Sequence, residues 1–349
     1  MRCKGSPKFV GLACALVLLQ LFSARVAAAQ NDPVLVLEIG TLDVPESEVF
    51  GRIIDVEVDS AGNIFVLDAQ SNNVRWFDRA GRFRGAAGHR GSGPGELMAP
   101  QAMTLDAKGD ILILDPRNAR MSRYRVGPDG LHHEEDLRTS LGIDLCAIGE
   151  RLFILTGRPD SLISEVDMRG RLVNAWGSLV EPDEDSASRL PPAISRSMAN
   201  RGRLLCDRDA GMIVMLHEQS PVVRAFDLEG KQVWRIELAD YHQIRVVRSG
   251  RTGGWTSAPD PKTGTVTSGA AIASMSRDTI AISLFEGGVA QTPGSYELRL
   301  LDLRNGSELG RYRAPIVVNR ITATDLVGHV MFPFPQIHRY ELHSVVGRK

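Results

Sequence analysis

One alternation of polar and apolar positions occurs twice near the start of the chain. Residues 59–68 (Asp-Ser-Ala-Gly-Asn-Ile-Phe-Val-Leu-Asp) return as residues 106–115 (Asp-Ala-Lys-Gly-Asp-Ile-Leu-Ile-Leu-Asp), 47 positions later. Each copy consists of a polar turn, a short apolar run and an acidic stop, and the glycine permits the positive φ of a tight turn. A turn-and-strand unit repeated at this spacing predicts a radial array of small β-sheets.

The residues around the first copy predict four short strands. An apolar alternation at 53–58 precedes the turn at 59–62, and the apolar run at 63–67 follows it. A third strand is expected at 74–77, and a second Asp-x-x-Gly turn at 78–81 leads into a fourth strand through Phe83. Four consecutive antiparallel strands make one blade of a β-propeller.

Five further units follow with varying regularity. The second aligns without gaps over its middle, with Tyr124 on Phe77, and the fourth aligns at a constant offset of 149, with Phe226 on Phe77. The other units are less regular: their strands are expected at 151–155, 162–166 and 172–176, at 270–275, 279–285, 296–301 and 309–312, and at 320–324, 330–333 and 337–342.

The sixth unit has no fourth strand of its own. An isolated apolar strand at residues 34–39 precedes the first complete unit, and pairing it with the last unit leaves no open sheet edge. We therefore predict an all-β fold, a six-bladed β-propeller of four-stranded antiparallel blades closed by its N-terminal strand. Five or seven blades are the alternatives.

These motifs resemble those of a known repeat family. Gly-Ser-Gly-Pro-Gly-Glu-Leu at 91–97, the repeated pattern at 59–68 and Phe-Asp-x-x-Gly at 77–81 look like the NHL repeat, and the chain resembles secreted bacterial six-bladed propellers of that type. The Trp-Asp signature of WD40 blades is missing, and Ser-Asn-Asn and Arg-Asn-Ala replace the histidine that is frequent in the NHL turn. Such propellers include lactonase-like, amidating-lyase-like and streptogramin-lyase-like enzymes, which generally place a cation near the central tunnel.

The N-terminus predicts export. Arg2, Lys4 and Lys8 precede an apolar run at 9–22, and three alanines at 27–29 fit a cleavage site. The run is short for a membrane span, so residues 1–29 are expected to be a cleaved signal peptide, with an uncleaved anchor as the alternative. Residues 30–349 then form a single propeller domain that is periplasmic or secreted, with no membrane insertion after cleavage, and is expected to be a monomer.

Charge and cysteine content narrow the function classes. Removing residues 1–29 leaves 37 basic and 42 acidic residues, so the net charge changes from −1 to −5 and gives no electrostatic footprint for nucleic acid. Cys146 and Cys206 remain and are placed on the inner strands of neighbouring blades. A disulfide is permitted in an oxidising compartment, but adjacent inner strands are expected to diverge, which favours two buried thiols.

Propeller geometry separates the loops into two faces. Turns between strands one and two, and between three and four, are uniformly tight and lie on one face. Loops between strands two and three, and between blades, lie on the other face and hold the long insertions at 88–100, 177–203, 240–268 and 286–295. Because loops on a rigid scaffold commonly carry function, the insertion-rich face is the predicted binding face.

Candidate site residues are polar groups expected on that face. Asp68 and Asp115 end second strands and could ring a cation or polar ligand, although an Asx cap of their own turns is the favoured interpretation. His217 occupies the matching position in the fourth unit and breaks the repeat. Arg245 and Trp255 lie in an insertion that could act as a lid, with a solvated loop as the alternative. The candidate ligand-binding set is Asp68, Asn73, Asp115, Asn118, Arg158, His217, Arg245 and Trp255.

The sequence favours a non-enzymatic binding module for an unknown small ligand or protein. The alternative is a metal-dependent hydrolase or lyase, lactonase-like or amidating-lyase-like, with Ca²⁺ or another divalent cation at the tunnel mouth. No cofactor, catalytic residue or metal ligand is identified from motifs: the chain has no nucleophile elbow. His132 and His133 would face opposite ways on a strand, so they cannot chelate together.

Overall fold

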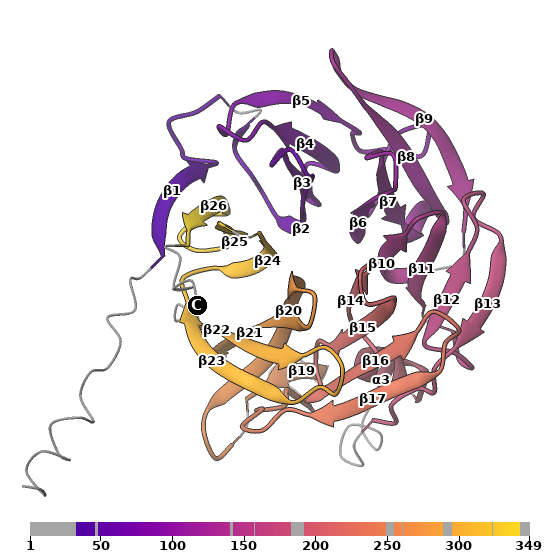
Figure 1. The fold of residues 1–349 in the computed structure, drawn as a ribbon, viewed down its shortest axis with the longest axis vertical. Helices are drawn as coiled ribbons and strands as arrows, with labels where there is room; N and C mark the ends of the chain where they lie inside the picture. Colours follow the sequence, from indigo (N-terminus) through magenta and orange to yellow (C-terminus); the bar gives the residue numbers. More distant parts are fainter. Residues whose placement is uncertain are drawn as a thin grey trace, which may run out of the picture.

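The computed structural model describes residues 33–45, 48–139, 142–156, 158–182, 192–248, 255–259, 261–288, 295–322 and 324–342. The predicted signal peptide at 1–29 lies outside them. In these residues six four-stranded antiparallel sheets are arranged in a ring, with one strand of each sheet facing the centre (Figure 1). No helix in the described residues is long and apolar enough to cross a membrane.

The first three blades run outward from the centre. Blade one contains β2 (Ile53–Val58), β3 (Ile64–Asp68), β4 (Asn73–Phe77) and β5 (Phe83–Ala87). Blade two contains β6 (Ala102–Leu105), β7 (Ile111–Asp115), β8 (Arg120–Gly127) and β9 (Gly130–Arg138), with the short 3-10 helix η2 (Pro116–Asn118) between β7 and β8. Blade three contains β10 (Gly142–Ile148), β11 (Arg151–Thr156), β12 (Ile163–Val166) and β13 (Leu172–Trp176).

The remaining blades complete the circle. Blade four contains β14 (Gly202–Asp207), β15 (Met212–His217), β16 (Val222–Asp227) and β17 (Gln232–Glu237). Blade five contains β20 (Thr265–Ser276), β21 (Thr279–Gly288), β22 (Ser295–Asp302) and β23 (Glu308–Ala314). Blade six contains β24 (Val317–Ile321), β25 (Asp325–Val330), β26 (Gln336–Glu341) and, from the other end of the chain, β1 (Val34–Ile39).

The N-terminal strand closes the ring, as the sequence predicted. Strand β1 pairs antiparallel with β26, from Val34 opposite Glu341 to Ile39 opposite Ile337. The predicted second strand of blade six, at 330–333, is wrong in position, because β25 ends at Val330. Proline lacks an N–H for the ladder, so the segment containing Pro333 and Pro335 is a loop.

The tight turns follow one local rule. Oδ1 of Asp59 accepts hydrogen bonds of 2.9 Å from the backbone N–H groups of Ala61 and Asn63, and Gly62 has a φ of 84°. An aspartate occupies the same place in the turns that begin at residues 78, 106, 167, 227 and 302. These carboxylates therefore shape turns, which leaves one face of the ring short and regular.

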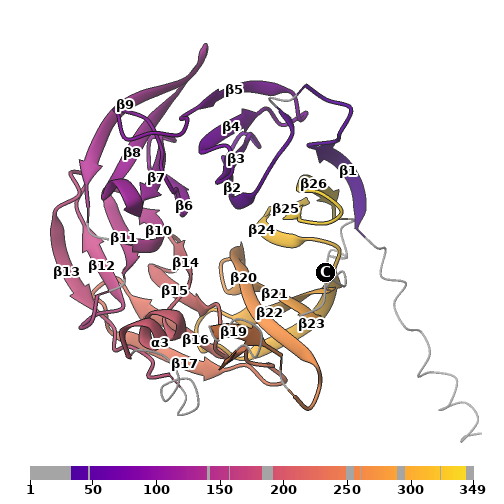
Figure 2. The ribbon, with the colours of Figure 1, turned by 180° about the vertical axis from the view of Figure 1, so that it is seen from behind.

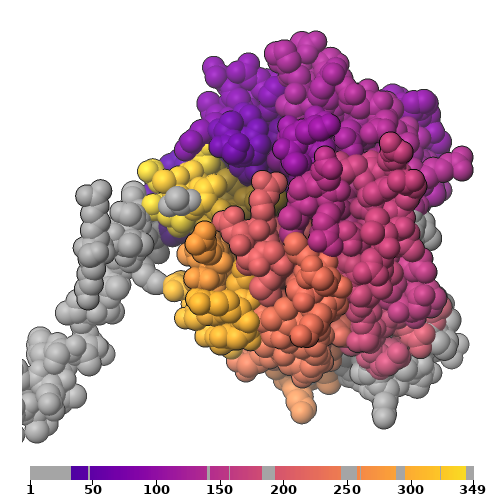
Figure 3. All heavy atoms as spheres, turned by 45° about the vertical axis from the view of Figure 1, so that its right-hand side comes forward, coloured from indigo at the N-terminus to yellow at the C-terminus, as the bar shows by residue number. Residues whose placement is uncertain are grey.

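The apolar core lies between the blades. The described residues form six apolar clusters, and each combines side chains from two neighbouring blades. For example, Ile337 of β26 packs in one cluster with Ile64 and Phe77 of blade one, so ring closure buries the apolar face of β26. On the side of the molecule that Figure 3 shows, segments of successive colour abut one another.

Buried arginines fasten the connectors between blades. Arg75 on β4, Arg224 on β16 and Arg299 on β22 occupy equivalent positions of their third strands and are at most 5% exposed. The Nη1 group of each donates a 2.6 Å hydrogen bond to a connector carbonyl, those of Val49, Ser178 and Ala239 respectively. A buried guanidinium is costly unless its donors are used, and here the backbone of the incoming connector uses them.

A disulfide joins blades three and four. Cys146 on β10 and Cys206 on β14 are bonded, with their Cα atoms 5.5 Å apart. The expectation of two buried thiols is therefore wrong. These inner strands do not diverge at this point, because Oδ2 of Asp144 on β10 accepts a 2.6 Å hydrogen bond from the backbone N–H of Leu204 on β14.

The insertions contain regular structure that the sequence interpretation did not include. Helix α3 (Pro192–Ala199) lies in the insertion before β14, and strands β18 (Arg245–Arg248) and β19 (Trp255–Ala258) form a hairpin in the insertion before β20. Figure 2 looks onto the face that carries α3. This insertion-rich face is where the candidate residues lie.

Candidate ligand site at the channel mouth

The acidic stops tie each connector to its blade. The Asp68 carboxylate accepts hydrogen bonds from the backbone N–H groups of Gly51 and Arg52 in the incoming connector, at 2.8 and 2.9 Å, and from Gln70 in its own turn at 2.9 Å. Burial alone would raise the pKa of Asp68, but these N–H donors outweigh it, and the pKa lies below its ordinary value. The bond from Gln70 is the cap of its own turn that the sequence favoured, whereas the bonds from Gly51 and Arg52 tie it to the incoming connector, a contact that the sequence interpretation did not include.

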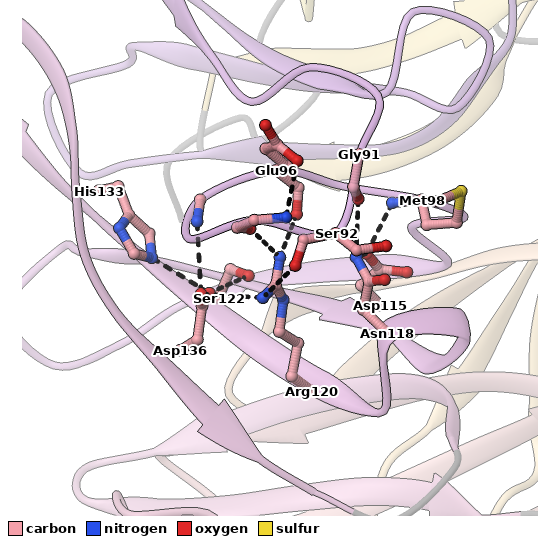
Figure 4. Close-up of polar contacts among 12 residues, drawn as sticks. Gly91, Ser92, Glu96, Met98, Asp115, Asn118, Arg120, Ser122, His133 and Asp136 are labelled. Carbon is pink, nitrogen blue, oxygen red and sulfur yellow. Dashed lines mark hydrogen bonds and ion pairs between the residues drawn. The ribbon is translucent and has the colours of Figure 1, made fainter.

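Asp115 and Asn118 do the same for blade two (Figure 4). The Asp115 carboxylate accepts hydrogen bonds from Met98 and Ala99 at 2.8 and 3.0 Å, and the Asn118 amide donates to Asp115 and to the carbonyl of Gly91. Their polar groups are therefore used in holding the glycine-rich connector.

Arg120 fixes the rest of that connector. Its Nη2 donates 2.6 Å hydrogen bonds to the carbonyls of Gly93 and Glu96, and its Nη1 lies 3.1 Å from Asp136. Asp136 also accepts from the Ser122 hydroxyl and contacts His133 at 3.1 Å. Figure 4 shows these groups converging from β8 and β9 beneath the connector.

His217 positions α3. It is fully buried at the end of β15, with Nδ1 3.0 Å from the carbonyl oxygen of Ala199, the last residue of α3. Burial lowers its pKa to about 4, so the ring is neutral at pH 7 and donates its Nδ1–H. Among the described residues Nε2 has no hydrogen-bond partner.

The other candidates lie apart from one another. Asn73 is half-buried on β4. Arg158 pairs with Asp160 at 3.2 Å and lines a cavity of about 190 Å³ beside α3. The backbones of Arg245 and Trp255 belong to the β18–β19 hairpin, and their side chains are outside what the structure describes. The candidate set is thus distributed over several blades and an insertion.

A larger cavity opens where the inner strands reach the insertion-rich face. Its volume is about 450 Å³, and we call it the mouth. Register shifts in β2, β10 and β20 leave Ile54, Ile143 and Ala270 as extra residues, and all three line it. A β-bulge of this kind redirects a side chain and ends regular pairing, so the bulges give the mouth its shape.

The mouth combines arginines with aromatic and aliphatic groups. Arg52, Arg201, Arg203 and Glu218 are its ionised residues, and Arg201 pairs with Glu218 at 3.2 Å. The exposed Arg52 side chain has no hydrogen-bond or ion-pair partner among the described residues. His329 contacts the Asn319 side chain at 2.8 Å, and burial lowers the pKa of His329 to about 4, so it is neutral at pH 7. The apolar lining includes Ile53, Val317, Phe285, Tyr296, Met331 and Phe332.

Beneath the mouth a smaller cavity of about 120 Å³, which we call the channel, is lined by a layer of five charged residues, one of which is Glu57 of β2. Asp55, Asp144, Arg203 and Arg320 come from four different blades. Each of these four lies on an innermost strand, opposite a residue of the second strand: Leu67, Leu155, Leu216 and Val327 respectively.

The acids of this layer are partly matched. Nη1 of Arg203 lies 3.9 Å from Asp144, and Nε of Arg320 donates a 2.9 Å hydrogen bond to Glu57. Burial raises the pKa of Asp144 to about 7 despite the attraction of Arg203, and it also raises the pKa of Asp55. The channel therefore holds carboxyl groups that resist ionisation.

The sequence interpretation missed both cavities. It placed Asp55 in an apolar-alternating strand and Arg203 at the end of an insertion, and it did not single out Asp144, whereas the structure places each of them in an innermost strand. A charge at such a position must face the channel or be paired, because the other side of the strand packs in the core. That signal was present in the sequence.

Asp68, Asp115 and His217 do not form a common site, since each is engaged within its own blade or with the adjoining connector or insertion. In the described parts of the chain, no three or more His, Cys, Asp or Glu side chains are grouped as metal ligands. The metal-dependent alternative stays a prediction.

Comparison with known proteins agrees with the architecture. A family model described as "6-bladed beta-propeller" matches residues 35–144. The chain is a six-bladed β-propeller. No curated protein matches it.

Solved structures that are similar in fold include the following three. A Bacteroides fragilis protein described as exported is 11% identical with a TM-score of 0.52, covering 90% of this chain and 96% of that one. A Bacteroides vulgatus protein is 8% identical with a TM-score of 0.57, covering 89% and 98%. The WD40 repeats of RRP9 are 10% identical with a TM-score of 0.51, covering 89% and 99%. At such identities the likeness concerns the fold alone.

Proposed function

We propose that this propeller is an exported, monomeric binding module that holds a ligand in the mouth. The observation that carries the proposal is the cavity of about 450 Å³, whose lining includes Arg52, with no side-chain partner among the described residues, and the 60%-exposed Phe332. Ligand sites typically measure ~300–1,000 Å³ and combine an apolar lining with a few polar groups. The mouth fits that description.

Two sequence features support the proposed export and repeat type. The basic and apolar N-terminus with its alanine exit supports export. The glycine-rich connector and the Asp-x-x-Gly turns support an NHL-type repeat. Both features concern location and ancestry, whereas the mouth itself supports the binding role.

A thermal-shift screen of residues 30–349 against a small-molecule library tests the binding role. We expect compounds that raise the Tm of the wild type and raise it less for Phe332→Ala, which removes an exposed side chain of the mouth. Arg117→Gln is the matched control, because Arg117 is an exposed residue of the same face that lines neither the mouth nor the channel. A library with no such compound, or equal shifts for wild type and Phe332→Ala, would contradict the proposal.

The same screen addresses the metal-dependent hydrolase or lyase. Ca²⁺, Mg²⁺ and Zn²⁺ are included, and the metal content of the purified protein is measured in parallel. A bound divalent ion that stabilises the protein would favour this alternative over the binding module.

A further inference from the structure

We infer that the mouth takes a small molecule with one acidic group and an apolar body, the acidic group lying against Arg52 and the body against Phe332. This inference rests on the proposed binding role and adds the chemical class of the ligand.

The charges lining the mouth favour an anion. Three arginines face a single glutamate, so the ionised lining residues carry an excess of two positive charges. The predicted mature chain, residues 30–349, carries a net charge of −5, so this concentration of positive charge is local and opposite in sign to the whole. Complementary local potential steers and selects charged ligands.

Arg52 is the residue whose charge is available. Arg201 already faces Glu218 at 3.2 Å, and Arg203 faces Asp144 at 3.9 Å in the layer below while donating a 3.3 Å hydrogen bond to the carbonyl of Ile54. Arg52 alone of the three has no side-chain partner among the described residues. One available guanidinium matches one carboxylate or sulfonate, which it can bind with two parallel hydrogen bonds.

The rest of the lining favours an apolar body. The rings of Phe285 and Tyr296 pack with their centroids 5.7 Å apart and contribute to the wall. Phe332 lines the same cavity with 60% of its surface exposed. When a ligand covers a large apolar side chain that is exposed in a cavity, the burial of apolar surface stabilises the complex. A purely polar anion would leave that surface uncovered.

Two dyes of the same shape separate the two parts of this inference. Anilinonaphthalene sulfonate (ANS) carries one anionic group, and N-phenylnaphthylamine (NPN) is the same ring system without it. Both are titrated into residues 30–349 by fluorescence, for wild type, Arg52→Gln, Phe332→Ala and the Arg117→Gln control. Arg52 and Phe332 are exposed, so their variants are expected to fold; the Tm of each variant verifies this.

We expect wild type to bind ANS more tightly than NPN. Arg52→Gln is expected to weaken ANS about tenfold, the loss of one hydrogen-bonded charge pair, and to leave NPN within about twofold because NPN has no charge to lose. Phe332→Ala is expected to weaken both dyes, and Arg117→Gln neither. Added salt should weaken ANS only, since screening acts on the charged dye.

Two other outcomes overturn different claims. If Phe332→Ala weakens both dyes but Arg52→Gln leaves ANS unchanged, or ANS binds no more tightly than NPN, the acidic ligand class is wrong while the binding role stands. If neither Phe332→Ala nor Arg52→Gln changes either dye, the mouth is not the binding site and the proposed function fails with the inference.

Discussion

Two groups of arginines in this propeller have opposite surroundings. Arg75, Arg224 and Arg299 are at most 5% exposed, and each donates to a connector carbonyl at 2.6 Å. Arg52 at the mouth is exposed and makes no side-chain hydrogen bond with the described residues, whereas the neighbouring Arg203 donates to Ile54 at 3.3 Å and faces Asp144 at 3.9 Å. In the connectors, therefore, arginine donors are used within the fold, whereas at the mouth the donors of Arg52 are not used by the described residues.

The difference indicates where binding can occur. A donor already bonded within the fold must break that bond before it can hold a ligand, whereas a donor that faces water exchanges one partner for another. In this protein the two kinds are separated by their partners, because the structural arginines are buried and all donate to connector carbonyls. Asp68, Asp115 and Asn118 fall in the structural group by the same criterion.

Removing a connector arginine should have the largest effect. We expect Arg224→Ala to lower the free energy of unfolding by about 2–4 kcal/mol, because it leaves the Ser178 carbonyl without its donor and opens a void beside Phe226. Denaturant unfolding measures this, with Arg117→Ala as the control, expected within ~0.5 kcal/mol of wild type. An Arg224→Ala protein as stable as wild type would remove the distinction between the two groups.

Most of the propeller architecture could be predicted from the sequence, but little of the mouth could. Turn aspartates, strand positions and ring closure follow from local chemistry, so a repeat that aligns Phe226 on Phe77 predicts them. It also aligns Arg224 on Arg75, and that pair of buried arginines could have been read as structural. The mouth could not be read this way, since it is formed by bulges at Ile54 and Ile143 in blades whose mutual distances no local pattern specifies.

The same limit explains the errors. The disulfide depends on the separation of two strands from different blades, and the Asp144–Leu204 hydrogen bond that brings them together is a contact between residues 60 positions apart. His217 does break the repeat, but for a structural reason, because its ring holds α3 through Ala199.

The charged layer beneath the mouth should make stability depend on pH. The pKa of Asp144 is about 7 in the fold against an ordinary 3.8, so its contribution to stability is fully present below about pH 3.8 and is lost as the pH rises through about 7. Buried His217 and His329, with pKa values of about 4 against 6.5, act in the opposite sense: their contribution is present above pH 6.5 and lost as the pH falls to about 4.

Asp144→Asn measures how much the Asp144 carboxyl group contributes to the pH dependence of stability. The asparagine oxygen can still accept from the Leu204 N–H, so the inter-blade contact is kept. Between pH 6.5 and 8 the two histidines contribute no change, and we expect the Tm of wild type to fall more than that of Asp144→Asn over this range. If the Tm of wild type and that of Asp144→Asn changed in parallel with pH, ionisation of Asp144 would not destabilise the fold. The channel would then not be the low-polarity site that the burial of Asp144 implies.

Neutralising the free arginine should have the smallest effect on stability. We expect Arg52→Gln to stay within about 0.5 kcal/mol of wild type in denaturant unfolding, because the Arg52 side chain has no partner to lose among the residues that the structure describes. Its backbone N–H still donates to Asp68 at 2.9 Å, so the connector contact survives the substitution. A loss above about 1 kcal/mol, beyond the range of an ordinary surface substitution, would place Arg52 with the structural arginines and leave the mouth without its available charge. An unchanged stability combined with weakened ANS binding would separate the two groups by experiment, one acting on folding and the other on recognition.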